Sequence, residues 1–150
     1  MNNIKLIVSE VDGILTDGKV AIDELSNRVF KNFNVDDLEV VNKLKSNIPL
    51  VFISSDNAVT YNLFRKKHLS FFWAKKDKKQ VFLQILRKYN VSADEVLYVA
   101  SKLSDLDCAY LAGTVLCPNN VNKALASVGQ TLESTMGEGV LTEIYLMYFR

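Results

Sequence analysis

The sequence has few of the residues that several common kinds of functional site require. Its two cysteines, Cys108 and Cys117, are too few for a disulfide framework and lack the spacing of a metal site. His68 is its only histidine and lies in a basic segment, which argues against serine–histidine chemistry. Neither a Walker-type phosphate loop nor a dinucleotide fingerprint follows the first apolar run. The low cysteine content is typical of a protein of the reducing cytoplasm.

Long apolar runs and an excess of one charge are also missing. No apolar run approaches membrane-spanning length, and residues 1–3 lead directly into a short strand-like run without a signal peptide. The net charge of +1 gives no electrostatic case for binding nucleic acid or membrane. Residues 65–79 are basic with interleaved aromatics, but residues 71–73 are better explained as a buried edge strand. We expect a cytoplasmic protein with no nucleic-acid and no membrane partner.

What the sequence does contain is an alternation of apolar strands and amphipathic helices. At 150 residues and 49% hydrophobic content, residues 1–150 can form one domain with a full core. Strands are predicted at residues 4–8, 50–53, 71–73, 96–100 and 114–116. Helices are predicted at residues 36–45, 58–67, 77–89, 103–111 and 120–126, and from residue 137 onward. This pattern predicts an α/β fold, a Rossmann-like three-layer α/β/α sandwich with a central parallel sheet. A β-hairpin formed by residues 19–23 and 28–33 protrudes from it.

Polar residues follow the predicted strands at the edge where open α/β sheets bind ligands. Glu10 and Asp12 follow the first strand and, at a spacing of two, are expected to share one face. Ser54 follows the second central strand, and residues 101–105 follow the fourth. Lys78, at the start of a helix, can reach the same edge. Carboxylates, a hydroxyl and a lysine at one edge suit phosphate chemistry with a carboxylate nucleophile.

Each of these positions also has a purely structural interpretation. The Asp-Gly pairs at residues 12–13 and 17–18 are common turn dipeptides. Ser54 fits a helix cap, and Lys78 lies in a charged run of a kind that is usually solvated. Residues 101–105 are compatible with a simple strand-to-helix turn. The order of these groups, each at its own strand end, favours the functional interpretation.

Five short motifs occur in order along nearly the whole chain. They are VDGILTDG at residues 11–18, FNV at 33–35, KDK at 76–78, LSDL at 103–106 and GEGV at 137–140. With these motifs the sequence resembles the haloacid dehalogenase-like superfamily, specifically the capless 3-deoxy-D-manno-octulosonate 8-phosphate phosphatases. That family includes the similar C-terminal domains of some acylneuraminate cytidylyltransferases.

The resemblance implies a role for each candidate residue. Glu10 lies at the position of the nucleophile that accepts the phosphoryl group, and Asp12 at that of the general acid. Ser54 and Lys78 match the phosphate-binding hydroxyl and lysine, and Asp105 matches a later acid. The resemblance also implies a magnesium ion, with Glu10, Asp12 and Asp105 as its candidate ligands here. It further implies a phosphorylated sugar acid as substrate and a homotetramer in which the hairpin of one subunit helps to close a neighbouring site.

The sequence departs from the family pattern at the chemical positions. Glu10 is one methylene longer than the family's aspartate, and in-line attack tolerates little displacement. Ser101 and Lys102 replace two acids of the metal motif, which removes a hard oxygen ligand and adds a positive charge. Asp36 and Thr142 stand where the family has arginines. We expect Lys102 to lie near Glu10 or Asp105 and to stand in for the missing cation.

Three hypotheses follow. The first is a catalytically inactive homologue that is retained as an oligomeric scaffold or regulatory module in sugar-acid metabolism. The second is a magnesium-dependent phosphatase of a phosphorylated sugar acid, with Glu10 as nucleophile and Asp12 as general acid. The third is a protein that binds an anionic sugar or a nucleotide through Lys78 and Lys102. Because fold-keeping motifs are retained while chemical positions change, the sequence favours the first.

Overall fold

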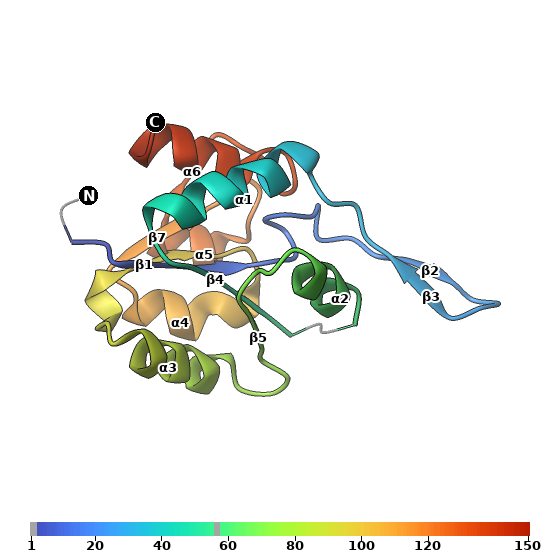
Figure 1. Ribbon diagram of the computed structural model, residues 1–150, viewed down its shortest axis with the longest axis horizontal. Coiled ribbons are helices and arrows are strands. Elements are labelled where there is room, and N and C mark those ends of the chain that lie inside the picture. The colour runs from blue at the N-terminus through green and yellow to red at the C-terminus, as the bar shows by residue number, and fades with distance from the viewer. Residues whose placement is uncertain (1–2, 56–57) are drawn as a thin grey trace.

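The computed structural model describes residues 3–55 and 58–150 and has a six-stranded parallel sheet at its centre (Figure 1). The strand order is β5-β4-β1-β6-β7-β8. The strands are β1 (Leu6–Glu10), β4 (Leu50–Ser54), β5 (Phe71–Trp73), β6 (Val96–Val99), β7 (Thr114–Cys117) and β8 (Gln130–Thr131). The α-helices are α1 (Val35–Asn47), α2 (Ala58–Lys66), α3 (Lys78–Tyr89), α4 (Leu106–Leu111), α5 (Lys123–Val128) and α6 (Val140–Tyr148). Two single 3₁₀ turns, η1 (Ala93–Glu95) and η2 (Leu103–Asp105), flank β6.

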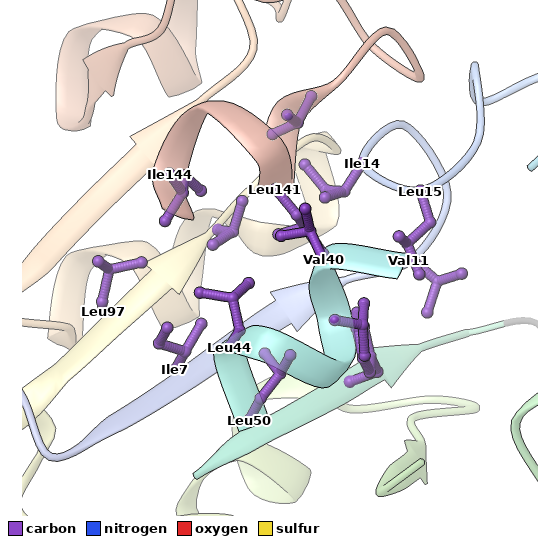
Figure 2. Packing of buried hydrophobic residues seen from close by; sticks show 14 of the residues in the cluster. Ile7, Val11, Ile14, Leu15, Val40, Leu44, Leu50, Leu97, Leu141 and Ile144 are labelled. Carbon is purple, nitrogen blue, oxygen red and sulfur yellow. The ribbon is translucent and has the colours of Figure 1, made fainter. Parts of the chain in front are cut away.

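Helices cover both faces of the sheet. On one face α1 and α6 pack together over a buried cluster that includes Ile7, Leu44 and Ile144 (Figure 2). On the other face α3, α4 and α5 cover a second cluster that includes Phe82 and Tyr98. A strand that is buried on both sides must be apolar on both sides, which explains the nearly continuous apolar runs of β1 and β4. The predicted three-layer α/β/α sandwich is confirmed.

The predicted hairpin is also confirmed and protrudes beyond the three layers (Figure 1). Its strands are β2 (Ala21–Asp23) and β3 (Arg28–Phe30), which pair antiparallel around a four-residue turn. Several large apolar side chains of the hairpin are exposed: Val20, Ile22, Leu25, Val29 and Phe30. These five residues are called the hairpin patch below. In the chain as described, nothing covers them.

The structure differs from the prediction at several element boundaries. The first strand runs two residues further than predicted and ends at Glu10, because Glu10 is still in register with Ile53 of β4. The two-residue strand β8 was not predicted, since it is too short to show a pattern. The helix predicted from residue 120 begins at Lys123, with Asn122 as its cap. β5 is an edge strand as expected, but Trp73 is 44% exposed rather than buried. Asp56 and Asn57, which the sequence offers as further candidate caps for the helix predicted at residues 58–67, lie outside the described residues.

The described part of the chain contains no helix with the length and apolar character needed to cross a membrane.

Helices α1 and α6 are joined by a buried acid, Asp37, which accepts hydrogen bonds from the backbone N–H and the hydroxyl of Thr142 at 2.9 and 2.7 Å. Burial raises the pKa of the Asp37 carboxyl above its usual range, against the effect of these hydrogen bonds. Thr142 therefore serves a contact between these two helices.

Candidate functional site: a buried cluster of acids and lysines

The candidate site lies where the central strands of the sheet end. Strand β1 is flanked by β4 and β6, so the segments that follow these three strands meet at one edge. Glu10 is the last residue of β1, Ser54 is the last of β4, and residues 101–105 follow β6. Glu10 and Ser54 are fully buried. Parallel pairing thus brings together residues that are far apart in the sequence, as the positions at the strand ends predicted.

Both oxygens of the Glu10 carboxylate have partners. Oε2 accepts a hydrogen bond from the ammonium of Lys78 at 2.5 Å. Oε1 accepts one from the backbone N–H of Val11 at 3.0 Å. Burial raises the pKa of Glu10, and the charge of Asp105 adds to this, while Lys78 and Lys102 oppose it. The carboxylate is therefore a buried, internally bonded group.

Lys78 joins two buried acids. Its ammonium donates to Asp105 Oδ1 at 2.7 Å and to the Ser104 hydroxyl at 3.0 Å, in addition to Glu10. Burial alone would lower the pKa of Lys78, but the carboxylates of Asp105 and Glu10 raise it above its usual value, so it stays charged at neutral pH. Lys78 is only 7% exposed, so the interpretation that it belongs to a solvated charged surface is wrong.

Asp105 accepts from both strand and loop donors. Its Oδ1 also accepts from the Tyr98 hydroxyl at 2.8 Å, and its Oδ2 accepts from the backbone N–H groups of Ser101 and Lys102, each at 2.9 Å. Burial, together with the nearby Asp105 charge, raises the pKa of Tyr98 well above its usual value. A neutral Tyr98 therefore donates to Asp105 at all moderate pH values. Sequence reasoning missed this role of Tyr98, because the residue lies within an apolar run.

Asp12 is fixed by its own loop and by the hairpin. Its Oδ1 accepts from the Thr16 hydroxyl at 3.1 Å, and its Oδ2 accepts from the ammonium of Lys31 at 2.9 Å. Thr16 Oγ1 in turn accepts from the backbone N–H groups of Gly13 and Gly18, which closes the loop. The side chain of Lys31 is only 1% exposed. Sequence reasoning missed Lys31, since a lysine in a predicted hairpin strand usually faces solvent.

Ser101 contacts the first loop at Asp12 and Gly13. Its hydroxyl donates to the backbone carbonyl of Asp12 at 2.6 Å. It lies so close to Gly13 that a Cβ on this glycine would be 2.8 Å from both Cβ and Oγ of Ser101. Gly13 also has a φ of +87°, in the left-handed region. The loop therefore requires glycine at this position for both reasons.

Lys102 lies beside both acids of the first loop. Its Nζ is 3.9 Å from Glu10 Oε1 and 3.7 Å from Asp12 Oδ2. Its side chain is 33% exposed, whereas those of Glu10 and Asp12 are 0% and 9% exposed. A partly exposed lysine side chain thus brings its ammonium close to two buried carboxylates. The predicted proximity of Lys102 to Glu10 is confirmed.

The C-terminal glycine motif closes one side of the same loop. A Cβ on Gly137 would be 2.6 Å from the backbone nitrogen of Asp17, so the two segments are in direct contact. The amide of Asn34 donates to the Gly137 carbonyl at 3.1 Å. The motifs at residues 11–18, 33–35 and 137–140, separate in the sequence, thus form one unit in the structure.

The residues at this site do not fit the magnesium ion that the resemblance implies. Within residues 3–55 and 58–150, no group of three or more histidine, cysteine, aspartate or glutamate side chains is arranged to hold a metal ion. The carbonyl of Asp12 already accepts from Ser101, and both oxygens of Asp105 accept from other donors. Magnesium needs hard oxygen ligands that are free to form an octahedral shell. The positive charge of Lys102 beside Glu10 and Asp12 would also repel a magnesium ion.

Comparison with known proteins gives consistent relatives. No protein-family model matches the chain. The 3-deoxy-D-manno-octulosonate 8-phosphate phosphatase of Haemophilus influenzae is 26% identical over 117 residues, which are 76% of this chain and 64% of that protein. The chain thus matches just under two thirds of the length of this curated relative.

Solved structures of such phosphatases share the fold. The cobalt-bound form of the Haemophilus influenzae enzyme has a TM-score of 0.85 at 23% identity and covers 97% of this chain and 86% of its own. The Moraxella catarrhalis enzyme, in complex with magnesium, phosphate and the sugar acid, has a TM-score of 0.83 at 25% identity and covers 95% of this chain and 83% of its own. The chain therefore has the fold of the haloacid dehalogenase-like superfamily and resembles its 3-deoxy-D-manno-octulosonate 8-phosphate phosphatases in both sequence and structure.

Proposed function

We propose that this protein is a non-catalytic homologue of the sugar-acid phosphate phosphatases and acts as an oligomeric scaffold or regulatory module in sugar-acid metabolism. The observation that carries the proposal is the state of Glu10, whose buried carboxylate bonds to Lys78 and to the Val11 N–H. A nucleophilic carboxylate needs an oxygen free to approach phosphorus in line. The Glu10 carboxylate is instead bonded to the Lys78 ammonium, where a phosphate group would otherwise bind.

The electrostatics of the site support the same conclusion. The lysine that matches the family's phosphate-binding residue, Lys78, already bonds to Glu10 and Asp105. An incoming phosphate would have to displace a buried carboxylate from a buried ammonium, which costs the free energy of that ion pair. It would also approach Glu10, a like charge. The site thus favours its internal pairs over an anionic substrate.

The first prediction concerns turnover. With magnesium present, the purified protein should hydrolyse neither 3-deoxy-D-manno-octulosonate 8-phosphate nor a chromogenic phosphate ester faster than Glu10→Gln does. Glu10→Gln removes the nucleophile and keeps the shape of the side chain, so it reports the background of the preparation. Phosphate release by the unaltered protein that disappears in Glu10→Gln would contradict the proposal.

A phosphatase that uses Glu10 is the second candidate, and one observation favours it. Asp12, at the position of the general acid, is held by hydrogen bonds from Thr16 and Lys31, so this side chain is kept in place even though the nucleophile position carries a glutamate. In this case the turnover assay would give a rate that depends on both acids. Loss of that rate in Asp12→Asn as well as in Glu10→Gln would identify this second candidate.

The second prediction concerns assembly. The hairpin patch exposes Ile22 at 62% and Phe30 at 55%, and such apolar area on a protruding hairpin favours contact with another subunit. We expect light scattering to give a homo-oligomer, with a tetramer as the form that the family resemblance implies. The double variant Ile22→Glu/Phe30→Glu should shift it to a monomer. Tyr110→Glu, a control at a 69% exposed residue on α4, should leave the mass unchanged. A monomer at micromolar concentration of the unaltered protein would contradict the scaffold proposal.

A further inference from the structure

Among the residues that the structure describes, the cluster contains as many ammonium groups as carboxylates. Three carboxylates, Glu10, Asp12 and Asp105, form ion pairs with three ammonium groups. Lys31 pairs with Asp12, Lys78 pairs with Glu10 and Asp105, and Lys102 lies near Glu10 and Asp12. A site that holds a divalent cation needs an excess of negative charge, because its interaction with the ion must outweigh the free energy of removing the ion's hydration water. The ion pairs described here leave no such excess.

Lys102 differs from the other two lysines in its place and its contacts. Lys78 and Lys31 lie within hydrogen-bond distance of their acids, at 2.5 and 2.9 Å. Lys102 Nζ lies at 3.7 and 3.9 Å from oxygens of two different acids, and the Lys102 side chain is the most exposed of the three. One positive charge close to two carboxylates is the arrangement expected of a bound cation. Here the cation is attached to the chain.

Ser101 completes the change. Its hydroxyl donates to the Asp12 carbonyl at 2.6 Å, so the residue acts here as a hydrogen-bond donor. A metal ligand at this point would instead offer a lone pair and, as a carboxylate, a negative charge. Ser101 therefore offers no carboxylate ligand, and its hydroxyl occupies the Asp12 carbonyl. Lys102, the next residue, supplies the positive charge that a metal ion would bring.

We propose that the ammonium of Lys102 is a tethered cation that takes the place of a divalent metal ion, and that it excludes such an ion from this site. The inference goes beyond the proposed function, because it rests on Lys102 and Ser101 and holds whether or not Glu10 is a nucleophile. Its direct consequence is that the unaltered protein needs no divalent ion to hold the side chains of Glu10 and Asp12 close together. Removing the charge of Lys102 should open the site to a metal ion.

The test uses Mn²⁺, whose free concentration is measured by electron paramagnetic resonance. The unaltered protein should leave Mn²⁺ free, with a Kd weaker than about 5 mM. Lys102→Met should bind Mn²⁺ at least tenfold more tightly than the unaltered protein, and Ser101→Asp/Lys102→Asp at least a hundredfold. Lys102→Arg, which retains the charge, and Lys79→Met, which removes an exposed lysine on α3, should behave as the unaltered protein.

Two results would overturn the inference. One is Mn²⁺ binding by the unaltered protein with a Kd below 5 mM, which needs no variant and so does not depend on how the variants fold. The other is a gain of less than tenfold in Lys102→Met, or in Lys102→Gln if the methionine variant does not give the circular dichroism spectrum of the unaltered protein. These outcomes are separate from those of the turnover assay, since turnover that depends on Glu10 would remove the proposed function and leave the metal measurement unaffected.

Discussion

Lys78→Met should lower the free energy of unfolding by about 3–5 kcal/mol, because it leaves two buried carboxylates without their shared cation. Glu10 and Asp105 are both fully buried, and each bonds directly to the Lys78 ammonium. Methionine has a similar length and fills the same space, so the loss reports the charge rather than a cavity. Glu10 and Asp105 would then repel each other in a medium of low dielectric constant, and one of them would be driven to take up a proton.

Urea unfolding followed by circular dichroism measures this loss, and a thermal melt should show a decrease in Tm of roughly 10 °C, given about 2–4 °C per kcal/mol for a chain of this size. Lys79→Met is the matched control, because Lys79 is the next residue of the same helix and is exposed. It should change the free energy of unfolding by less than about 0.5 kcal/mol. A loss below about 1 kcal/mol in Lys78→Met would mean that the ion pairs with Glu10 and Asp105 contribute little to stability.

Lys78 also shows what sequence can and cannot predict here. The charged run around it is compatible with solvent exposure, and periodicity alone does not tell which lysine of the run turns inward. Its position at the start of α3 predicted that it could reach the strand ends, and the structure confirms this. The exact partners depend on how far α3 lies from β1, which is set by packing across the sheet.

The parts of the site that sequence could not predict all depend on contacts between distant segments. Lys31 pairs with Asp12 only because the hairpin returns over the first loop. Tyr98 is hidden in an apolar strand, and its hydroxyl has a role only because Asp105 lies at the end of the next loop. The order of strands and helices was predicted well, since each depends on local pattern. The short strand β8 was missed because it depends on pairing with β7.

The charges of the site explain how its buried acids can be stabilised by lysine side chains. In a buried cluster, each carboxylate must be paired or protonated, since an isolated buried charge is very costly. Lys31, Lys78 and Lys102 supply three positive charges from three separate segments. Under the proposal made above for Lys102, the same lysine that compensates Glu10 and Asp12 also keeps a divalent ion out of the site. Retained loop motifs and altered chemical positions are compatible in one stable structure for this reason.

The second large effect is expected at Gly13. Gly13→Ala should lower the free energy of unfolding by about 3 kcal/mol, because two costs add. An alanine at a φ of +87° is strained by about 1–2 kcal/mol. Its Cβ would also lie 2.8 Å from Cβ and Oγ of Ser101, so the loop or the strand end must move and the Ser101 hydrogen bond to the Asp12 carbonyl is disturbed.

A second glycine separates these two costs. Gly18 has a similar φ of +80°, but the nearest atom to a Cβ there is 3.6 Å away, so Gly18→Ala should show the strain alone, about 1–2 kcal/mol. Ser101→Gly removes the atoms that clash and should cost about 1–2 kcal/mol by itself through the lost hydrogen bond. The double variant Gly13→Ala/Ser101→Gly should therefore cost at least 1 kcal/mol less than the sum of the two single variants. Urea unfolding of the unaltered protein, the single variants Gly13→Ala and Ser101→Gly, and the double variant measures this coupling. Costs of the two single variants that add within about 0.3 kcal/mol would show that an alanine at residue 13 does not clash with Ser101.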